Sequence, residues 1–273
     1  MTESSSASSQ QPPIALDTSV AHSARLWNYL LGGKDNFAAD RAAAQYALAL
    51  MPELVLSARA DREFLGRTVR YLAIEAGIRQ FLDIGTGLPT ANNTHEVAQS
   101  VAPESHIVYV DNDPMVLVHA RALLTSTPEG ATDYIDADVR DPEKILQAAA
   151  DTLNFDQPIA IMLLGIMNFV VDNDEAFAIV DRLLEAVPSG SHLVVSHPTM
   201  EVNPTAVEES MRHWNESGAA PITARSPQEI TRFFQGLELL EPGVVSCSRW
   251  RPDPDNPGVD VDVSEFGGVG RKA

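Results

Sequence analysis

Residues 79–94, RQFLDIGTGLPTANNT, are the part of this sequence from which the fold can be inferred. Residues 81–84 form a short apolar run with one acid near its tip, which is typical of the end of a buried strand. The Gly85-Thr86-Gly87 segment then predicts a sharp turn, because glycine adopts backbone angles that a side chain forbids. We expect Thr90 or Asn92 to cap the helix that follows. A strand, a Gly-x-Gly turn and a helix form one half of a nucleotide-binding βαβ unit.

The composition narrows the classes of function. The chain has 273 residues, of which 44% are hydrophobic and 21% charged, as in ordinary globular proteins. Its net charge of −19 argues against sequence-independent binding to nucleic acid or anionic membranes, which requires clusters of Lys and Arg. The single Cys247 excludes an internal disulfide. No signal peptide and no apolar run of 18 residues is present, so a cytoplasmic protein is expected.

Three regions follow from the sequence pattern. Residues 1–18 begin with a stretch rich in Ser, Gln and Pro, and we expect a disordered tail there. Residues 19–77 show three helical patterns and are expected to form an N-terminal cap or lid. The second of these helices is predicted over 38–50, with Asp35 or Asn36 as its cap. Residues 78–273 are the predicted ligand-binding domain.

Strands and helices alternate after the glycine turn. Four strand–helix pairs and a fifth strand predict a doubly wound, mostly parallel sheet with right-handed crossovers. The less regular C-terminal region predicts two more helices and two more strands, the last over 261–269 at the far end of the sheet. The expected fold is therefore α/β with seven strands. The predicted strands after the first lie at 107–110, 134–135, 159–164, 192–196, 237–240 and 261–269.

Three acids mark successive strand ends in this pattern. Asp83, Asp111 and Asp138 are 28 and 27 residues apart, which is one βαβ step each. Ligands bind at the carboxyl ends of strands in such sheets. A dinucleotide is disfavoured, because Thr90 stands where the third glycine belongs and the carboxylate of Asp83 would repel a pyrophosphate. S-adenosylmethionine has no phosphate and carries cationic groups, so an acid at this place favours it.

Each acid is given a role on this hypothesis. Asp83 would organise the methionine end, directly or through water, while Asp111 would accept from both ribose hydroxyls. Asp138 would accept from the adenine amino group. For any single acid, a turn or helix-cap role is the alternative. The expected donor-binding residues are Asp83, Gly85, Thr86, Gly87, Asn93, Asp111, Asn112, Asp138, Val139 and Leu164.

The sequence resembles an actinobacterial family of S-adenosylmethionine-dependent methyltransferases of the class I fold, long catalogued as a domain of unknown function. The resemblance covers nearly all of the chain after the tail. It implies a class I methyltransferase fold and S-adenosylmethionine as the methyl donor. The chain departs from the family pattern after the fourth strand, where Met167-Asn168 stands in place of the expected Leu-His. The matching segments include 24–44, 79–99, 108–124, 136–146, 236–243 and 248–252.

The residues that would act on the acceptor are less evident. Tyr29, Lys34, Asn36 and Phe37 cluster around two glycines between predicted helices, and they are interpreted either as a lid over the ligands or as ordinary helix caps. His197 and Tyr29 are candidate catalytic groups, although each histidine could equally fill space. No histidine shows metal-ligand spacing, so no metal is expected. Trp27, Trp214 and Trp250 are interpreted as packing residues.

The leading hypothesis is a methyltransferase that acts on a small molecule, as a monomer or homodimer. Methyl transfer is an in-line displacement that depends on positioning, so an acid–base residue is optional. The first alternative is a non-catalytic sensor of S-adenosylmethionine or S-adenosylhomocysteine that binds a partner protein, for which Asn168 is the sequence evidence. The second is an NAD-type oxidoreductase, which Asp83 and the missing glycine disfavour.

Overall fold

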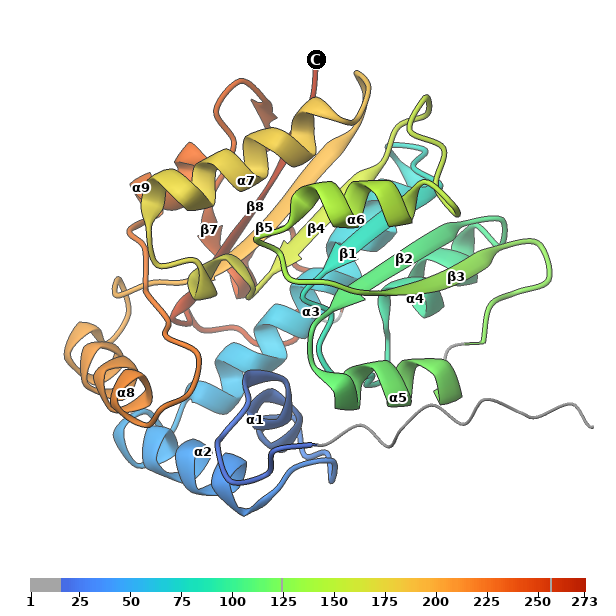
Figure 1. Cartoon of the computed structure of the whole chain (residues 1–273). Coiled ribbons are helices and arrows are strands. Elements are labelled where there is room, and N and C mark those ends of the chain that lie inside the picture. The colour runs from blue at the N-terminus through green and yellow to red at the C-terminus, as the bar shows by residue number, and fades with distance from the viewer. Residues whose placement is uncertain (1–15, 124, 256) are drawn as a thin grey trace, which may run out of the picture.

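A central sheet organises the computed structural model, which describes residues 16–123, 125–255 and 257–273 (Figure 1). The sheet order is β3-β2-β1-β4-β5-β8-β6, and the short strand β7 pairs with β8 off this path. Strands β1 to β5 run parallel, as predicted, and β8 runs antiparallel to β5. The strands are β1 (Gln80–Ile84), β2 (His106–Asp111), β3 (Ala131–Asp136), β4 (Ala160–Leu164), β5 (His192–Pro198), β6 (Glu238–Leu239), β7 (Val245–Ser246) and β8 (Glu265–Arg271).

The position of β8 corrects one prediction. The last strand does not lie at the far end of the sheet but between β5 and β6. Its register pairs Ser196 with Gly267, so that the C-terminal strand is hydrogen-bonded on both sides. The sheet therefore remains mostly parallel, with one antiparallel strand inserted near its end.

Helices cover both faces of the sheet. The α-helices are α1 (Ser23–Leu30), α2 (Ala38–Leu50), α3 (Leu54–Ile74), α4 (Thr94–Val101), α5 (Pro114–Leu123), α6 (Pro142–Ala149), α7 (Asn173–Glu185), α8 (Pro204–Glu216) and α9 (Pro227–Arg232). Two short 3-10 helices are η1 (Met167–Phe169) and η2 (Cys247–Arg249). Within these described ranges, no helix combines the length and the apolar character that a membrane span requires.

Alternate strand residues face two separate cores. On one face, Leu82 and Val108 pack with apolar residues of α6 and α7. On the other face, Phe81 and Ile107 pack with apolar residues of α3 and α4. This alternation follows from the two-residue period of a strand, and it explains why the central strand β4 is apolar on both faces.

Helices α1, α2 and α8 lie on the side of the sheet to which the carboxyl ends of the parallel strands point (Figure 1). Residues 1–15 of the predicted tail lie outside the described residues. Within the predicted cap region 19–77, α3 belongs to the layer that covers one face of the sheet. Of the predicted cap region, only α1 and α2 therefore lie over the strand ends. Helix α8, from the C-terminal half of the chain, lies beside them.

Two predicted helix caps lie elsewhere in the structure. α4 begins after Asn93, whose backbone N–H donates to the Glu96 carboxylate at 2.8 Å, whereas Asn92 precedes the cap with φ at +61°. α2 begins after Phe37, whose N–H donates to Asp40 at 2.7 Å. In both cases an acid in the first helical turn satisfies the free N–H, a function that the sequence analysis gave to residues upstream.

Trp250 provides a test of how the C-terminal segment is fastened to α3. Its ring is fully buried and meets the rings of Phe64 and Tyr71 edge-on, at 5.6 and 6.0 Å. We expect Trp250→Ala to reduce the free energy of unfolding by about 3–5 kcal/mol in urea titrations, because the cavity left behind cannot be filled. Ile74→Ala is the control, since this side chain is 60% exposed. A loss below about 1 kcal/mol for Trp250→Ala would contradict this packing.

Candidate active site

The three acids that the sequence analysis singled out face one cavity, which we call the first cavity. Asp83 lies in β1, Asp111 ends β2, and Asp138 follows β3. The first cavity has a volume of about 240 Å³. From the predicted donor-binding set, it is lined by Asp83, Gly85, Thr86, Gly87, Asp111, Asn112, Asp138, Val139 and Leu164.

The glycine turn forms the floor of this cavity. Gly85 and Gly87 have φ angles of +80° and +67°, which favour glycine strongly. The Gly85 N–H donates to the carbonyl of Val110 at 2.8 Å, so the turn is fixed to the end of β2. A Cβ atom on Gly85 would come within 2.6 Å of the Ile166 side chain. Both conformation and space therefore require glycine at position 85.

Asp83 is a buried carboxyl with one close donor. The side chain is 4% exposed, and the Thr94 hydroxyl donates to it at 2.6 Å. Burial raises the pKa of Asp83 to about 6, although the Thr94 hydrogen bond opposes this rise. The group is thus poised to change its charge near neutral pH, and a cation beside it would favour the ionised form.

Asp111 joins the glycine turn to the loop after β2. Its two carboxyl oxygens accept from the backbone N–H groups of Gly87, at 2.8 Å, and Asp113, at 2.9 Å. Burial raises the pKa of Asp111, and these two hydrogen bonds lower it again. An ionised carboxylate has lone pairs for further donors, so hydroxyl groups in the cavity could still bind to it.

Asp138 lies at the more open side of the first cavity. Its side chain is 41% exposed and accepts from Asn112 Nδ2 at 3.1 Å. The Arg140 backbone N–H donates to the same carboxylate at 2.9 Å, and the Arg140 guanidinium lies 3.3 Å away. Arg140 also lines the cavity, and the sequence analysis did not identify it.

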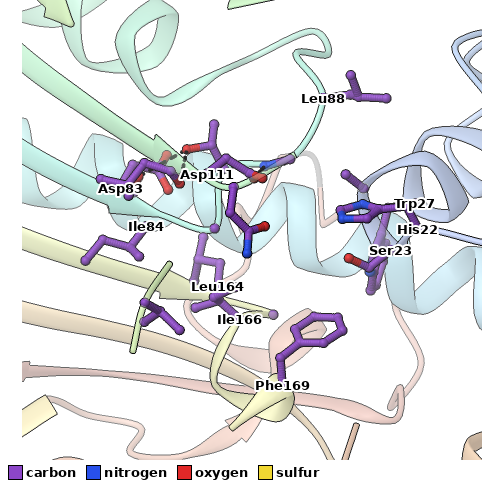
Figure 2. Close-up of a pocket in the computed structure, with 18 of the residues that line it drawn as sticks. His22, Ser23, Trp27, Asp83, Ile84, Leu88, Asp111, Leu164, Ile166 and Phe169 are labelled. Atoms are coloured by element: carbon purple, nitrogen blue, oxygen red, sulfur yellow. Dashed lines mark hydrogen bonds between the residues drawn. The ribbon is translucent and has the colours of Figure 1, made fainter. Parts of the chain in front are cut away.

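Helix α1 supplies the opposite wall. Ala24, Trp27, Asn28 and Leu31 have the spacing of one helical face, and all of them line the first cavity. Figure 2 shows Trp27, with His22 and Ser23 from the same segment, across the cavity from Asp83 and Asp111. The resemblance in residues 24–44 drew attention to this segment, but the face that meets the cavity is set by tertiary contacts.

The residues predicted to form a lid do not line the first cavity. The Lys34 side chain is exposed, and the Asn36 amide donates to Asn28 Oδ1 at 3.0 Å. Phe37 lies under the guanidinium of Arg25, 5.5 Å from the ring centre. The Tyr29 hydroxyl accepts from Gln45 at 3.4 Å. These four residues shape the turn between α1 and α2 from outside the cavity.

Two other residues of the predicted site, His197 and Asn93, make contacts that hold the fold together. His197 is fully buried outside the first cavity; its Nδ1 lies 2.9 Å from the Pro198 carbonyl and its Nε2 lies 2.7 Å from Arg225 Nη1. Burial lowers the pKa of His197 to about 3. Asn93 caps α4, and its Oδ1 accepts from the Thr90 N–H. Neither His197 nor Asn93 is placed to touch a ligand in the first cavity.

A second cavity opens beside the first, beneath α1, α2 and α8. It has a volume of about 150 Å³ and shares Ser23, Trp27, Gly165, Phe169 and Trp214 with the first cavity. Trp27 and Trp214 are therefore cavity walls, which corrects their interpretation as packing residues only. Trp250 lines neither of these two cavities and is fully buried. Across the described residues, no group of three His, Cys, Asp or Glu side chains could hold a metal ion.

The family of this chain is identified by comparison with known proteins. The profile of the S-adenosyl methyltransferase family matches residues 9–273. The chain belongs to this family. It is thus an S-adenosylmethionine-dependent methyltransferase whose acceptor is unidentified. The hypothesis of an NAD-type oxidoreductase is set aside by this assignment. No curated protein matches the chain.

Solved structures support the same assignment. A DUF574 family protein from Streptomyces avermitilis is 48% identical, with a TM-score of 0.90 over 94% of this chain and 99% of that chain. A protein from Thermobifida fusca is 46% identical, with a TM-score of 0.84 over 96% and 98% of the two chains. An O-methyltransferase family protein from Burkholderia thailandensis, 15% identical, shares the fold alone, with a TM-score of 0.52 over 84% and 62%.

Gly85 provides a direct test of the first cavity. We expect Gly85→Ala to abolish binding of S-adenosylhomocysteine in titration calorimetry, because the methyl group must displace the Ile166 side chain and the positive φ is strained. The matched control is Gly66→Ala in α3, where an added Cβ meets nothing within 4 Å. Unchanged binding by Gly85→Ala would show that the ligand does not approach this turn.

Proposed function

We propose that the first cavity is the methyl-donor site and that the acceptor is a small molecule in the second cavity. The observation that carries the donor assignment is the convergence of Asp83, Asp111 and Asp138 on one cavity at the ends of neighbouring strands. Three acids suit a donor with an ammonium and a sulfonium, two ribose hydroxyls and an adenine amino group. They do not suit a pyrophosphate.

Each acid has a specific role in this proposal. Asp83 holds the ammonium of the methionine part, and Gly85 and Gly87 allow the ligand to approach the backbone. Asp111 accepts from the ribose hydroxyls with the lone pairs that its two backbone donors leave free. Asp138 accepts from the adenine amino group, beside the backbone of Val139. Leu164 and Ile166 provide apolar surface on which the base packs.

The chain contributes position and a dry environment to the reaction. When bound, S-adenosylmethionine supplies an electrophilic methyl group, which an acceptor lone pair takes while the carbon–sulfur electron pair stays on sulfur. Trp27, Phe169 and Trp214 stand between the two cavities and exclude water from this meeting point. Positioning two reactants in line supplies much of the rate enhancement in such displacements.

The acceptor's size and charge are limited by its surroundings. The second cavity, of about 150 Å³, is lined by residues of α1, α2 and α8 and suits a small molecule. The net charge of −19 repels a nucleic-acid backbone. These two observations support a small-molecule acceptor rather than a polymer.

Asp111 is the sharpest test of the donor site. We expect Asp111→Ala to weaken S-adenosylhomocysteine binding about 10- to 100-fold in titration calorimetry, since hydrogen bonds to a charged group contribute about 1.5–3 kcal/mol. Asp156→Ala, which removes an exposed carboxylate far along the chain, is the control. If Asp111→Ala binds as tightly as the wild type while remaining folded, the donor lies elsewhere.

The pH dependence of donor binding tests the role of Asp83. Because its pKa is raised to about 6, Asp83 is largely protonated below that pH and attracts a cation less. We expect donor affinity to fall about tenfold for each unit of pH below about 6, as required when only the ionised form binds. The Asp83→Asn variant should lose the pH dependence of donor affinity that comes from Asp83 and retain the pH dependence that comes from Asp111. Parallel pH profiles for both proteins would contradict the assignment.

A further inference from the structure

The second cavity has an apolar body. Its walls come from α1, α2, the start of α3 and α8, and they are formed mainly by Leu26, Leu30, Met51, Leu54, Val207 and Met211. The rings of Tyr46 and His213 stack at 3.6 Å and close the wall between α2 and α8. An occupant must therefore present mostly apolar surface to these helices.

Glu265 introduces a carboxyl group into this apolar cavity. It is the first residue of β8, lines the second cavity and is 4% exposed. Its side chain lies on the face of β8 that it shares with Gly267, where an added Cβ would meet Phe64 of α3. The carboxyl therefore faces the α3 side of the sheet. No side chain or backbone group of the described residues donates to its buried Oε1.

A second acceptor without a donor lies in the same cavity. The Ser196 hydroxyl lies close enough to Glu265 to lower the pKa of that carboxyl, but its one hydrogen is donated to Asp61 Oδ1 at 2.6 Å. Asn168, which lines the same cavity and is 7% exposed, has a buried Oδ1 that finds no donor in the described part of the chain. Burial raises the pKa of Glu265 well above its usual range, and the neighbouring charge of Asp61 raises it further.

Two buried acceptors without donors are costly, unless a ligand supplies the missing hydrogens. A hydroxyl group brings one hydrogen, whereas an amine brings two or three and carries a positive charge in its ammonium form. Asp61 lines the first cavity and Glu265 the second, so this acidic pair stands where the two cavities meet. A nitrogen held there lies next to the proposed methyl donor.

We propose that the acceptor is an amine on an apolar, ring-sized body, and that Glu265 and Asn168 bind its nitrogen, which is the atom methylated. This inference rests on the proposed function of the two cavities. In the reaction, the ammonium gives one proton to the Glu265 carboxylate and so regains a lone pair. The nitrogen then bonds to the methyl carbon as the carbon–sulfur pair remains on sulfur. The product leaves as a methylated ammonium, and the Glu265 proton passes to solvent.

Binding of three matched probes tests this inference on the full-length protein. The probes are 2-phenylethylamine, 2-phenylethanol and 3-phenylpropanoate, which share a ring and differ in the charge and hydrogens of the end group. Ligand-observed NMR titrations with saturating S-adenosylhomocysteine measure their affinities. We expect the amine to bind at least tenfold more tightly than the alcohol or the acid. Equal binding of the three would overturn the inference.

Glu265→Gln tests which residue holds the amine. We expect this variant to lose at least tenfold in affinity for 2-phenylethylamine, whereas Glu208→Gln, which removes one exposed carboxylate from α8, keeps it. Wild-type affinity in Glu265→Gln would overturn the inference. Asn168→Leu removes the second acceptor without touching the carboxyl and should weaken the amine several-fold, which keeps the test open if Glu265→Gln fails to fold.

A separate titration distinguishes this inference from the proposed function. Calorimetry with S-adenosylhomocysteine on the same proteins reports on the first cavity alone. If that ligand fails to bind the wild type, the donor assignment fails, whatever the amine does. If it binds the wild type and Glu265→Gln equally while the amine shows no preference, only the inference about the acceptor fails.

Discussion

The buried guanidinium of Arg25 is the contact on which the geometry of both cavities depends. Arg25 is 4% exposed and lies between Asp40 of α2 and Asp113 of the loop after β2, with Nε–Oδ distances of 3.6 and 4.0 Å. Nearby, His22 Nδ1 approaches the same Asp113 at 3.0 Å. These contacts fasten α1 to the loop that follows Asp111. Since α1 forms a wall of both cavities, its position decides whether donor and acceptor can meet.

A buried ion pair of this kind is better understood as a positioning device than as a source of stability. Removing charges from water costs about as much as their attraction returns, although breaking an existing pair is expensive. Arg25 also donates to the carbonyls of Asp17 and Val20, so its guanidinium orders the segment before α1. The cap is thereby held in one place over the strand ends.

The sequence predicted the parts of the site that depend on local pattern. Asp83, Asp111 and Asp138 could be found because each follows a recognisable strand, and parallel strands place their carboxyl ends at one edge. The Gly85-Thr86-Gly87 turn could be found because glycine marks backbone that other residues cannot adopt. These features need only neighbouring residues and the order of the strands.

The features that were missed depend on contacts distant in sequence. Trp27 and Trp214 come from opposite halves of the chain and line the same cavities only because α8 packs against α2. No periodicity in either helix distinguishes a cavity wall from a core face. Likewise, the predicted base His197 had the position expected of a catalytic group, but Arg225, from a later loop, occupies its Nε2.

The position of β8 within the sheet depends on side-chain packing, which the sequence pattern alone does not reveal. Glycines inside a strand mark a close approach by another group. At Gly267 that group is the Phe64 ring of α3, which an added Cβ would meet at 2.8 Å. A strand with such an approach suits a covered position, and β8 is indeed paired on both sides. The insertion of β8 beside β5 also brings Glu265 to the second cavity, so an edge strand would have given this cavity a different wall.

Both cavities contain buried carboxyl groups. Burial raises the pKa of Asp83, Asp111, Asp61 and Glu265, because an ionised carboxyl loses its water there. These buried carboxyl groups do not increase the solubility of a protein whose net charge is already −19, so their burial is a cost in free energy. The cost is offset when a cation enters, since each positive charge restores the ionised form of a neighbouring carboxyl. If the two cavities bind donor and acceptor as proposed, their buried acids favour a cationic donor and a cationic acceptor, just as the net charge of −19 disfavours a nucleic-acid backbone.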